Sequence, residues 1–294
     1  MELRVLNYFL AVVREGTISG AAERLHISQP TLSRQLSELE EELGKPLFLR
    51  GNRRISLTEE GMLFCRRARE ISDLAEKTVD DIQNAENMVG GTVYIGGGET
   101  EAMRLPAAVC KKLMLKYPDI RFSLYSGDAD DVAERLEKGL LDFGVFVEPA
   151  DLKKYDGLRL PQEDTWGILM RKDSPLARME SIRPADLQDL PLLCSQRALV
   201  KNELAQWMKS DYGKLKVAAN YNLIYNAALM VEEGVGYAFC LDKLVNTGGE
   251  SKLCFRPLEP RLRANLDLVW KKHRVLSRAA QAFLEALKEE LASA

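Results

Sequence analysis

The chain has 294 residues, a net charge of −3 and 46% apolar residues, which is the composition of an ordinary soluble protein with two or three compact units. The overall charge does not favour nucleic acid, so a DNA-binding surface would need its lysines and arginines concentrated locally. No stretch approaches the length needed to cross a bilayer, which excludes a membrane-spanning protein.

The N-terminal residues and the cysteines indicate a cytoplasmic location. The apolar stretch at the N-terminus is interrupted by Glu2, Arg4 and Asn7, so it lacks the pattern of a signal peptide. The five cysteines are scattered and have no CxxC spacing, as expected in a reducing cytoplasm. Because His26 and His273 are the only histidines, we expect no metal site, and we expect no cofactor.

The pattern of the first 45 residues predicts three short helices, and the third has the features of a recognition helix. Ser28 can cap its N-terminus, and Pro30 fits the first turn, where a missing N–H costs nothing. One arc of this helix is apolar and another is polar: Leu32, Leu36, Leu39 and Leu43, against Gln29, Pro30, Ser33, Arg34 and Ser37. A helix that reads base edges needs this division. Taken alone, the pattern is equally typical of an amphipathic surface helix.

A cationic hairpin is predicted directly after this helix. Pro46–Phe48 and Ile55–Leu57 have the pattern of two short strands, and the turn between them, Arg50–Arg54, carries three arginines. A solvated loop with three arginines is common elsewhere in proteins. After a helix-turn-helix it is more typical of a wing whose arginines lie over phosphates or in the minor groove.

The N-terminal region as a whole carries a dense and specific pattern. It comprises the stretch Gly16–Leu36, then Leu39-Glu40, Leu43-Gly44, Pro46-Leu47-Phe48, Arg50 and Leu57-Thr58-Glu59-Glu60-Gly61. This pattern closely resembles the LysR-type transcriptional regulators. The resemblance implies sequence-specific binding to double-stranded operator or promoter DNA, with RNA polymerase as a partner if the protein is an activator. It implies base contacts from Gln29, Pro30, Ser33 and Arg34, a phosphate contact from Thr31, and backbone or minor-groove contacts from Arg50, Arg53 and Arg54.

A long helix is predicted after the wing, beginning at a Thr58 cap. Its small and apolar residues alternate at spacings of four and three, which indicates a coiled-coil seam: Phe64, Ala68, Ile71, Ala75, Thr78, Ile82, Ala85 and Val89. The alternative is a helix that lies on its own domain. The resembled family uses this helix to pair protomers, which implies a homodimer, and the family also suggests tetramers. Gly90-Gly91 is expected to end the helix.

From Thr92 onward, strands and helices alternate, which predicts parallel sheets covered by helices on both faces. We therefore expect an N-terminal all-α winged helix-turn-helix (1–58), a linker helix (59–90) and a C-terminal two-lobed α/β effector-binding domain (91–294). The resemblance implies that this last domain is similar to a type 2 periplasmic binding protein. Lobe 1 is expected to comprise about 91–161 plus 266–294, and lobe 2 about 162–265, because the last strand and helix have no partner in lobe 2.

Ligands of open α/β sheets bind beyond the carboxyl ends of the strands, at helix N-termini. This rule and the resemblance select the expected effector-binding residues: Gly98, Glu99, Thr100, Ser126, Val147, Cys194, Ser195 and Phe239. The rule also points to their neighbours Gly127, Glu148 and Cys240 and to the stretch Asn220–Asn222. In the family, a Ser or Thr at the position of Thr100 often binds a carboxylate. Here Glu99 and Glu101 flank it and can satisfy the same helix N-terminus, which suggests a neutral or cationic effector. The alternative is that both are solvated capping residues with no ligand role.

Other classes of protein are less well supported. The run Gly96–Gly98 lacks a GxGxxG register and a P-loop lysine, so nucleotide binding is weakly indicated. A cytoplasmic small-molecule binding protein of the same architecture is an alternative, as is a redox sensor acting through Cys194, although a small buried residue is the more usual role for such a cysteine. No nucleophile–base pair or paired acid and base is evident, so we expect no enzyme activity.

Overall fold

The computed structural model describes residues 1–49, 55–83, 89–148, 152–195, 203–208 and 215–293. The chain divides into two compact units, Met1–Gln83 and Asn84–Ala294. Within the described ranges, no helix is both long and apolar enough to cross a membrane.

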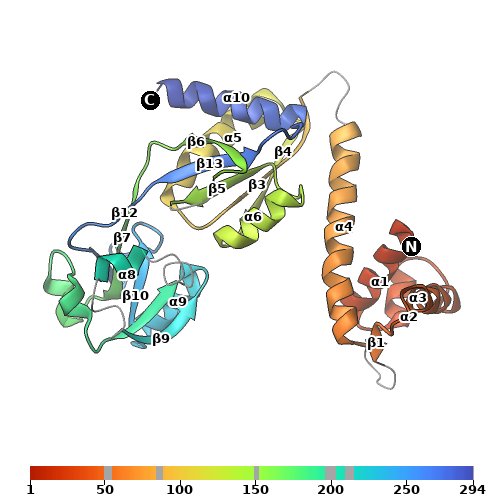
Figure 1. Ribbon diagram of the computed structural model, residues 1–294, viewed down its shortest axis with the longest axis horizontal. Helices are drawn as coiled ribbons and strands as arrows, with labels where there is room; N and C mark the ends of the chain where they lie inside the picture. The colour runs from red at the N-terminus through yellow and green to blue at the C-terminus, as the bar shows by residue number, and fades with distance from the viewer. Residues whose placement is uncertain (50–54, 84–88, 149–151, 196–202, 209–214, 294) are drawn as a thin grey trace. The chain divides into compact units, whose positions relative to one another are not determined.

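The first unit consists of four helices and a short hairpin (Figure 1). They are α1 (Leu3–Glu15), α2 (Ile18–Arg24), α3 (Gln29–Leu43), β1 (Phe48–Leu49), β2 (Ser56–Leu57) and α4 (Glu59–Gln83). Three of the helices begin at a hydroxyl residue that accepts a backbone N–H, as the sequence predicts. Thr17 accepts from Gly20 at 3.1 Å, Ser28 from Thr31 at 3.3 Å, and Thr58 from Gly61 at 2.9 Å.

The core of the first unit is built around Phe9 of α1, which is fully buried. Its ring lies 5.1 Å from that of Phe48 in the hairpin and 4.9 Å from that of Phe64 in α4, which joins three elements at one point. Helix α3 contributes the predicted residues Leu32, Leu36 and Leu39, all buried in this core. The fourth predicted residue, Leu43, is 39% exposed because the helix ends at Gly44, beyond the reach of the core.

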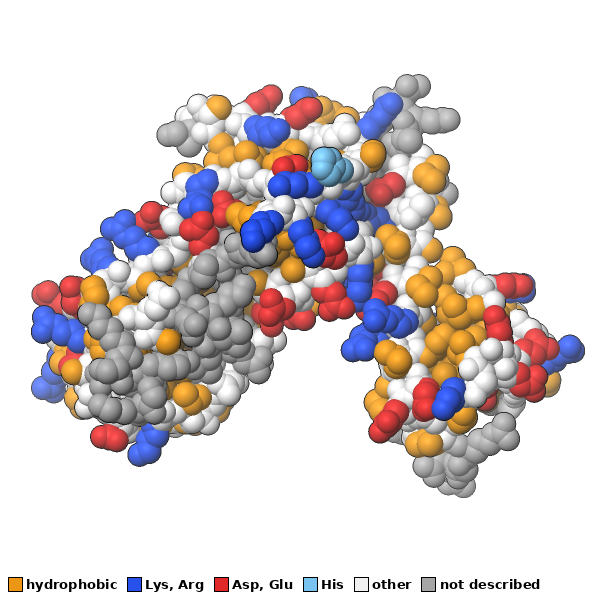
Figure 2. Space-filling view, viewed as in Figure 1, with side chains coloured by type: hydrophobic (Ala, Val, Ile, Leu, Met, Phe, Trp, Pro, Cys, Tyr) orange, Lys and Arg blue, Asp and Glu red, His pale blue; other side chains and the backbone are white. Residues whose placement is uncertain are grey.

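Helix α4 differs from the predicted seam. Ala68 is fully buried and Phe64 packs in the core around Phe9, so the start of the seam faces its own unit. Val89 lies outside α4 and packs against the core of the second unit, and Ala85 lies outside the described residues. The large apolar side chains that α4 leaves exposed are Met62, Leu63, Ile71, Leu74, Val79 and Ile82, and of these only Ile71 and Ile82 belong to the predicted seam. Figure 2 shows hydrophobic side chains along α4.

The second unit contains two sheets. The first, with its helices, is called lobe 1 and has the strand order β4-β3-β5-β13-β6. Its strands are β3 (Gly91–Gly97), β4 (Ile120–Ser126), β5 (Phe143–Val147), β6 (Tyr155–Arg159) and β13 (Leu266–Lys271). Helices α5 (Arg104–Lys116) and α10 (Arg278–Ser293) cover one face, and α6 (Ala129–Glu137) covers the other (Figure 1). A 3-10 turn, η1 (Glu101–Met103), precedes α5.

Lobe 2 is built on the second sheet, of order β11-β7-β10-β8-β9, with β12 pairing β7. Its strands are β7 (Asp164–Arg171), β8 (Pro191–Ser195), β9 (Lys216–Tyr221), β10 (Tyr237–Leu241), β11 (Leu253–Pro257) and β12 (Arg263–Ala264). Two 3-10 turns, η2 (Pro175–Arg178) and η3 (Pro184–Leu187), follow β7. Helix α8 (Glu203–Met208) packs on one face and α9 (Ile224–Glu232) on the other.

Both sheets are mixed, whereas the sequence predicted parallel sheets. In lobe 1, β3, β4 and β5 are parallel, but β13 runs antiparallel to β5 and β6. In lobe 2, β8, β9 and β10 are parallel, and β7 is antiparallel to β10. A parallel pair requires a crossover, usually through a helix. Strand β13 instead enters lobe 1 directly after β12 of lobe 2, so it runs against its neighbours.

Candidate nucleic-acid interface and ligand pocket

The N-terminal half of α3 presents its polar side chains to solvent. Gln29, Pro30, Thr31 and Arg34 are exposed and Ser33 is half-buried, while Leu32, Leu36 and Leu39 of the same helix are buried. The Arg34 side chain is 80% exposed, and its Nε donates to Oε1 of Glu38 at 2.8 Å, one turn later. An exposed face of this kind, at the N-terminus of a helix with an apolar back, fits a major groove.

The hairpin is fixed to α3 by a single carboxylate. Oε1 of Glu40 accepts from the backbone N–H of Leu47 at 2.6 Å and from that of Phe48 at 3.1 Å. Strands β1 and β2 then pair through Phe48–Leu57 and Leu49–Ser56. The predicted wing arginines Arg50, Arg53 and Arg54 lie outside the described residues. The Glu40 carboxylate therefore fixes the position of the hairpin strands, which flank the predicted wing, relative to α3.

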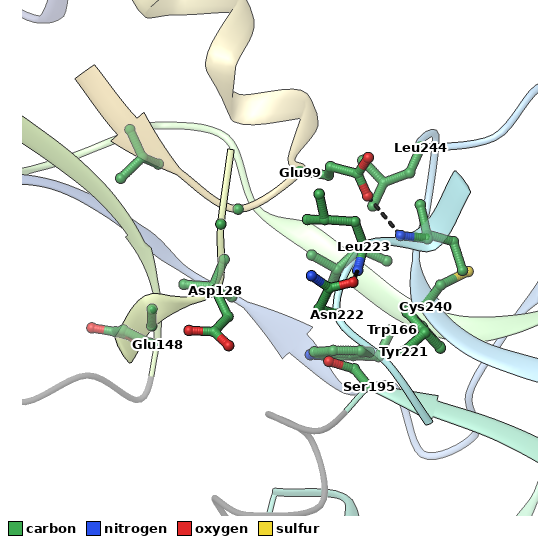
Figure 3. A pocket seen from close by; sticks show the side chains of 17 residues that line it. Glu99, Asp128, Glu148, Trp166, Ser195, Tyr221, Asn222, Leu223, Cys240 and Leu244 are labelled. Atoms are coloured by element: carbon green, nitrogen blue, oxygen red, sulfur yellow. Dashed lines mark hydrogen bonds between the residues drawn. The ribbon is translucent and has the colours of Figure 1, made fainter. Parts of the chain in front are cut away.

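A pocket in the second unit lies where parallel strands of both lobes end (Figure 3). The described residues that line it from lobe 1 lie near the end of β5 or follow β3, β4 or β5, and those from lobe 2 lie at the end of β8, β9 or β10 or follow β9 or β10, with Trp166 of β7 beside them. They are Gly98, Glu99, Gly127, Asp128, Ala129, Val145, Val147, Glu148, Trp166, Ser195, Tyr221, Asn222, Leu223, Ile224, Cys240, Leu241 and Leu244. Ligands of open α/β sheets bind at such strand ends.

Acidic groups and one unpaired donor define the polarity of this pocket. Glu99, Asp128 and Glu148 line it, and its described lining contains no lysine or arginine. Glu148 is paired with Arg159 and also accepts from Asn265 at 3.0 Å, whereas one oxygen of Asp128 caps α6 through Asp130 and Asp131, both at 2.9 Å. The indole Nε1 of Trp166 is buried and has no hydrogen-bond partner among the described residues. A buried donor without a partner is costly, so a ligand acceptor would relieve it.

The structure shows an unexpected partner for Glu99. We expected Glu99 and Glu101 to satisfy the N-terminus of the helix that follows them, but the hydroxyl of Thr100 does so, accepting from Ala102 N at 3.0 Å. Glu101 pairs with Arg104. Oε2 of Glu99 instead accepts from the backbone N–H of Ile224 at 2.7 Å, at the start of α9 in lobe 2.

Thr100 and Ser126 do not line the pocket; they line an adjoining hollow, formed mainly by lobe 1 with Lys243 and Leu244 of lobe 2, that shares Gly98, Glu99 and Leu244 with the pocket. Thr100 is 8% exposed, and its hydroxyl donates to Oδ2 of Asp164 at 2.5 Å. Burial raises the pKa of Asp164, and the Thr100 hydrogen bond opposes that rise. The Thr100 hydroxyl is thus already hydrogen-bonded within the protein. The resemblance implied a hydroxyl that is free to bind a carboxylate of the ligand.

Cys194 and Phe239 were also expected at the pocket, but neither side chain lines it. Both side chains are fully buried in the core on the α8 face of lobe 2, where Phe239 lies against Trp207. Their successors, Ser195 and Cys240, line the pocket. Successive side chains of a strand point to opposite faces, so choosing a strand end without its face misplaces the site by one position.

Four of the eight expected effector residues, Gly98, Glu99, Val147 and Ser195, do line the pocket. Of the further residues that the strand-end rule selects, Gly127, Glu148, Tyr221, Asn222 and Cys240 also line the pocket. Sequence reasoning missed Trp166, Leu223 and Ile224 as pocket residues, although Leu223 and Ile224 directly follow the selected stretch. Trp166 lies near the start of β7, and no sequence signal of this kind points to it.

The buried cysteines do not have the features of a thiol sensor. All five cysteines are free, and burial raises the pKa of Cys194 and that of Cys240 to about 12. Reactive cysteines are usually exposed and have a lowered pKa. In the described part of the chain, no three His, Cys, Asp or Glu side chains gather closely enough to hold a metal ion.

A winged helix-turn-helix and a two-lobed α/β domain with a pocket at its strand ends define a ligand-responsive DNA-binding regulator. The profile for the bacterial regulatory helix-turn-helix protein of the lysR family matches residues 3–62, and that for the LysR substrate binding domain matches residues 86–292. The chain belongs to the LysR family. It is a LysR-type DNA-binding transcription regulator with an effector-binding domain, and it is not an enzyme.

Similar proteins span nearly the whole chain. A "Probable RuBisCO transcriptional regulator" of Synechocystis sp. is 29% identical over 96% of this chain and 84% of its own length. The "HTH-type transcriptional regulator BsdA" of Bacillus subtilis is 31% identical over 66% of each chain. The crystal structure of CbnR, a LysR family transcriptional regulator, has a TM-score of 0.75 at 20% identity and covers 98% of this chain and 99% of its own. Full-length CbnR in complex with its target DNA has a TM-score of 0.71 at 21% identity, with the same coverage. At these identities the solved structures establish the fold.

The raised pKa values predict that Cys194 and Cys240 resist alkylation in the folded protein. At pH 8, a thiol with a pKa of about 12 is about a thousandfold or more less ionised than an unfolded cysteine. Iodoacetamide labelling followed by site-resolved mass spectrometry should therefore modify both residues only after denaturation in guanidinium. Rapid labelling of native Cys194 would contradict the buried position and revive the redox sensor.

Proposed function

We propose that α3 and the wing read the operator. Gln29, Pro30, Ser33 and Arg34 would contact base edges, Thr31 a phosphate, and Arg50, Arg53 and Arg54 the DNA backbone or minor groove. The observation that carries this proposal is the exposed polar face of α3 above a fully buried leucine face. Because operator DNA is chromosomal, the cytoplasm is the proposed place of action. RNA polymerase is a further partner if the regulator activates transcription.

Arg34 is expected to give the largest single contribution to sequence preference. A guanidinium that contacts a guanine edge is worth about 1–3 kcal/mol of discrimination, so Arg34→Ala should weaken operator binding by about 5- to 150-fold. Electrophoretic mobility shift on the cognate promoter, with scrambled DNA as competitor, measures this loss. Arg4→Ala is the matched control, because Arg4 is an exposed arginine at the start of α1 that pairs with Glu2.

Arg53→Ala separates base reading from backbone binding in the same assay. A lost phosphate contact should weaken binding to all sequences alike. It should also reduce the slope of the logarithm of the binding constant against the logarithm of the salt concentration by about one. Specific binding that survives Arg34→Ala would show that α3 does not read bases through this residue.

We propose that two chains pair through the exposed apolar arc of α4. The supporting observation is that Leu63, Ile71, Leu74 and Ile82 are 51%, 43%, 41% and 68% exposed although all four are large and apolar. Pairing two copies would present two reading heads to two half-sites. A tetramer is the further proposal. It is supported by exposed apolar residues on the edge strand β4 and on α5, namely Leu124, Met114 and Leu115.

Ile82→Glu is expected to weaken this dimer, because a charge in an apolar contact must be desolvated without a partner. Sedimentation equilibrium of the full chain should give a dimer dissociation constant at least tenfold higher than that of the unmodified protein. Met62→Glu is the control, since Met62 is 57% exposed but lies away from the arc. Equal dissociation constants for both variants and the unmodified chain would place the dimer contact elsewhere.

We propose that the pocket between the lobes holds the effector, and that the effector is neutral or cationic. The carboxylates of Glu99 and Asp128 in the pocket favour an effector that is neutral or cationic. The unpaired Nε1 of Trp166 favours an effector that carries a hydrogen-bond acceptor. The apolar residues between them, such as Val147 and Leu241, favour a ligand with a hydrocarbon body.

A thermal-shift screen of amines, alcohols and carboxylates with matched carbon skeletons tests this proposal. Amines and alcohols should stabilise the protein, and Trp166→Phe should weaken the best of them about three- to tenfold through loss of one hydrogen bond. Trp270→Phe is the control, because Trp270 packs on Phe143 in lobe 1 and does not line the pocket. A screen in which simple carboxylates alone bind would overturn the assignment.

A further inference from the structure

Helix α9 begins without a cap from its own segment. Leu223 occupies the N-cap position and its side chain makes no capping hydrogen bond. Asn222 satisfies the N–H of Leu223 at 2.9 Å, which leaves the first N–H of the helix itself, that of Ile224. Unpaired N–H groups at a helix start carry partial positive charge and attract anions. The start of α9 therefore needs an acceptor from elsewhere.

Glu99 supplies that acceptor from the opposite lobe. It follows β3 of lobe 1, and its Oε2 lies 2.7 Å from the nitrogen of Ile224 in lobe 2. Figure 3 shows Glu99 reaching toward the chain at Leu223, with a dashed line at the hydrogen bond. Both partners line the pocket, so this hydrogen bond joins the two walls of the proposed effector site.

The local sequence frees Glu99 for this role. Thr100 caps the turn that follows Glu99, and Glu101 is engaged by Arg104. Glu99 has no arginine or lysine partner among the described residues, so the helix start is the positive group that its carboxylate meets. A hydrogen bond from an N–H to an ionised carboxylate is stronger than a hydrogen bond from the same N–H to a neutral acceptor.

We propose that Glu99 is the internal anion of the pocket: it caps α9 from lobe 1, holds the two walls together, and excludes small carboxylates from the start of α9. A ligand group that faces Glu99 must then be a hydrogen-bond donor or a cation. This inference deepens the proposed function, because it rests on the pocket being the effector site. It makes Glu99 the residue that determines the charge of the effector.

Chemical rescue of Glu99→Ala in the full-length chain tests the proposal. The variant should melt about 2–4 °C below the unmodified protein, because one helix cap is lost. Propionate, which carries a carboxylate like the one that the substitution removes, should restore that melting temperature, and it should bind the variant at least tenfold more tightly than it binds the unmodified chain. Propionamide and propylamine should not restore it. Glu101→Ala is the matched control, with no rescue expected, because its carboxylate does not reach α9.

Equal stabilisation of the unmodified chain and of Glu99→Ala by propionate would overturn the proposal, as would no stabilisation of either. Glu99→Gln fills the same space without the charge, and it should melt between the other two proteins without responding to propionate. A Glu99→Gln protein that is as stable as the unmodified chain would show that the charge is irrelevant. The rescue uses no effector, so it can succeed even if the pocket is not the effector site. In that case only the ligand screen fails.

Discussion

Every helix begins with backbone N–H groups that have no partner inside the helix, and the fold of this regulator depends on how those groups are satisfied. Ser28 caps α3, the helix proposed to read DNA, Thr58 caps α4, and Asp128 caps α6. In each case the cap comes from the residue just before the helix, so the local sequence fixes where the helix starts. Helix α9 differs from these three, because the carboxylate that accepts from its first N–H, that of Glu99, comes from a distant part of the chain in the other lobe.

The hydrogen bond between Glu99 and Ile224 gives the sensor domain a way to couple ligand binding to the arrangement of its lobes. A helix cap contributes about 0.5–2 kcal/mol, and energetic coupling between sites in regulated proteins is typically about 1–3 kcal/mol. A ligand that competes with Ile224 for Glu99 would thus change the free energy of the contact between the two lobes by an amount that is sufficient for regulation. In the first unit, by contrast, Glu40 fixes the hairpin to α3 within one compact core, which suits a rigid reading head.

The sequence predicted the reading head well, and the sensor domain less completely, for physical reasons. Caps and apolar spacing are local, so Ser28 and the buried Leu32, Leu36 and Leu39 of α3 follow directly from neighbouring residues. Which face of a strand meets a pocket depends on packing with distant segments, and this is why Cys194 and Phe239 were placed one residue away from the pocket.

The same distinction explains the other differences. Ala68 fits a dimer seam by its spacing, but the aromatic cluster around Phe9 draws that side of α4 into its own unit. The Glu99–Ile224 hydrogen bond joins residues 125 positions apart, and no local pattern encodes it.

Residue-resolved hydrogen–deuterium exchange of the full-length chain at Ile224 tests most directly whether Glu99 caps α9. The backbone amide of Ile224 should exchange about five- to tenfold faster in Glu99→Ala than in the unmodified protein, because loss of a cap worth about 1 kcal/mol lowers its protection by that factor. Exchange in Glu101→Ala, and at Ala238 in the buried strand β10 of either variant, should not change. Identical exchange at Ile224 with and without the Glu99 carboxylate would contradict the cap, and with it the role of Glu99 in joining the two lobes.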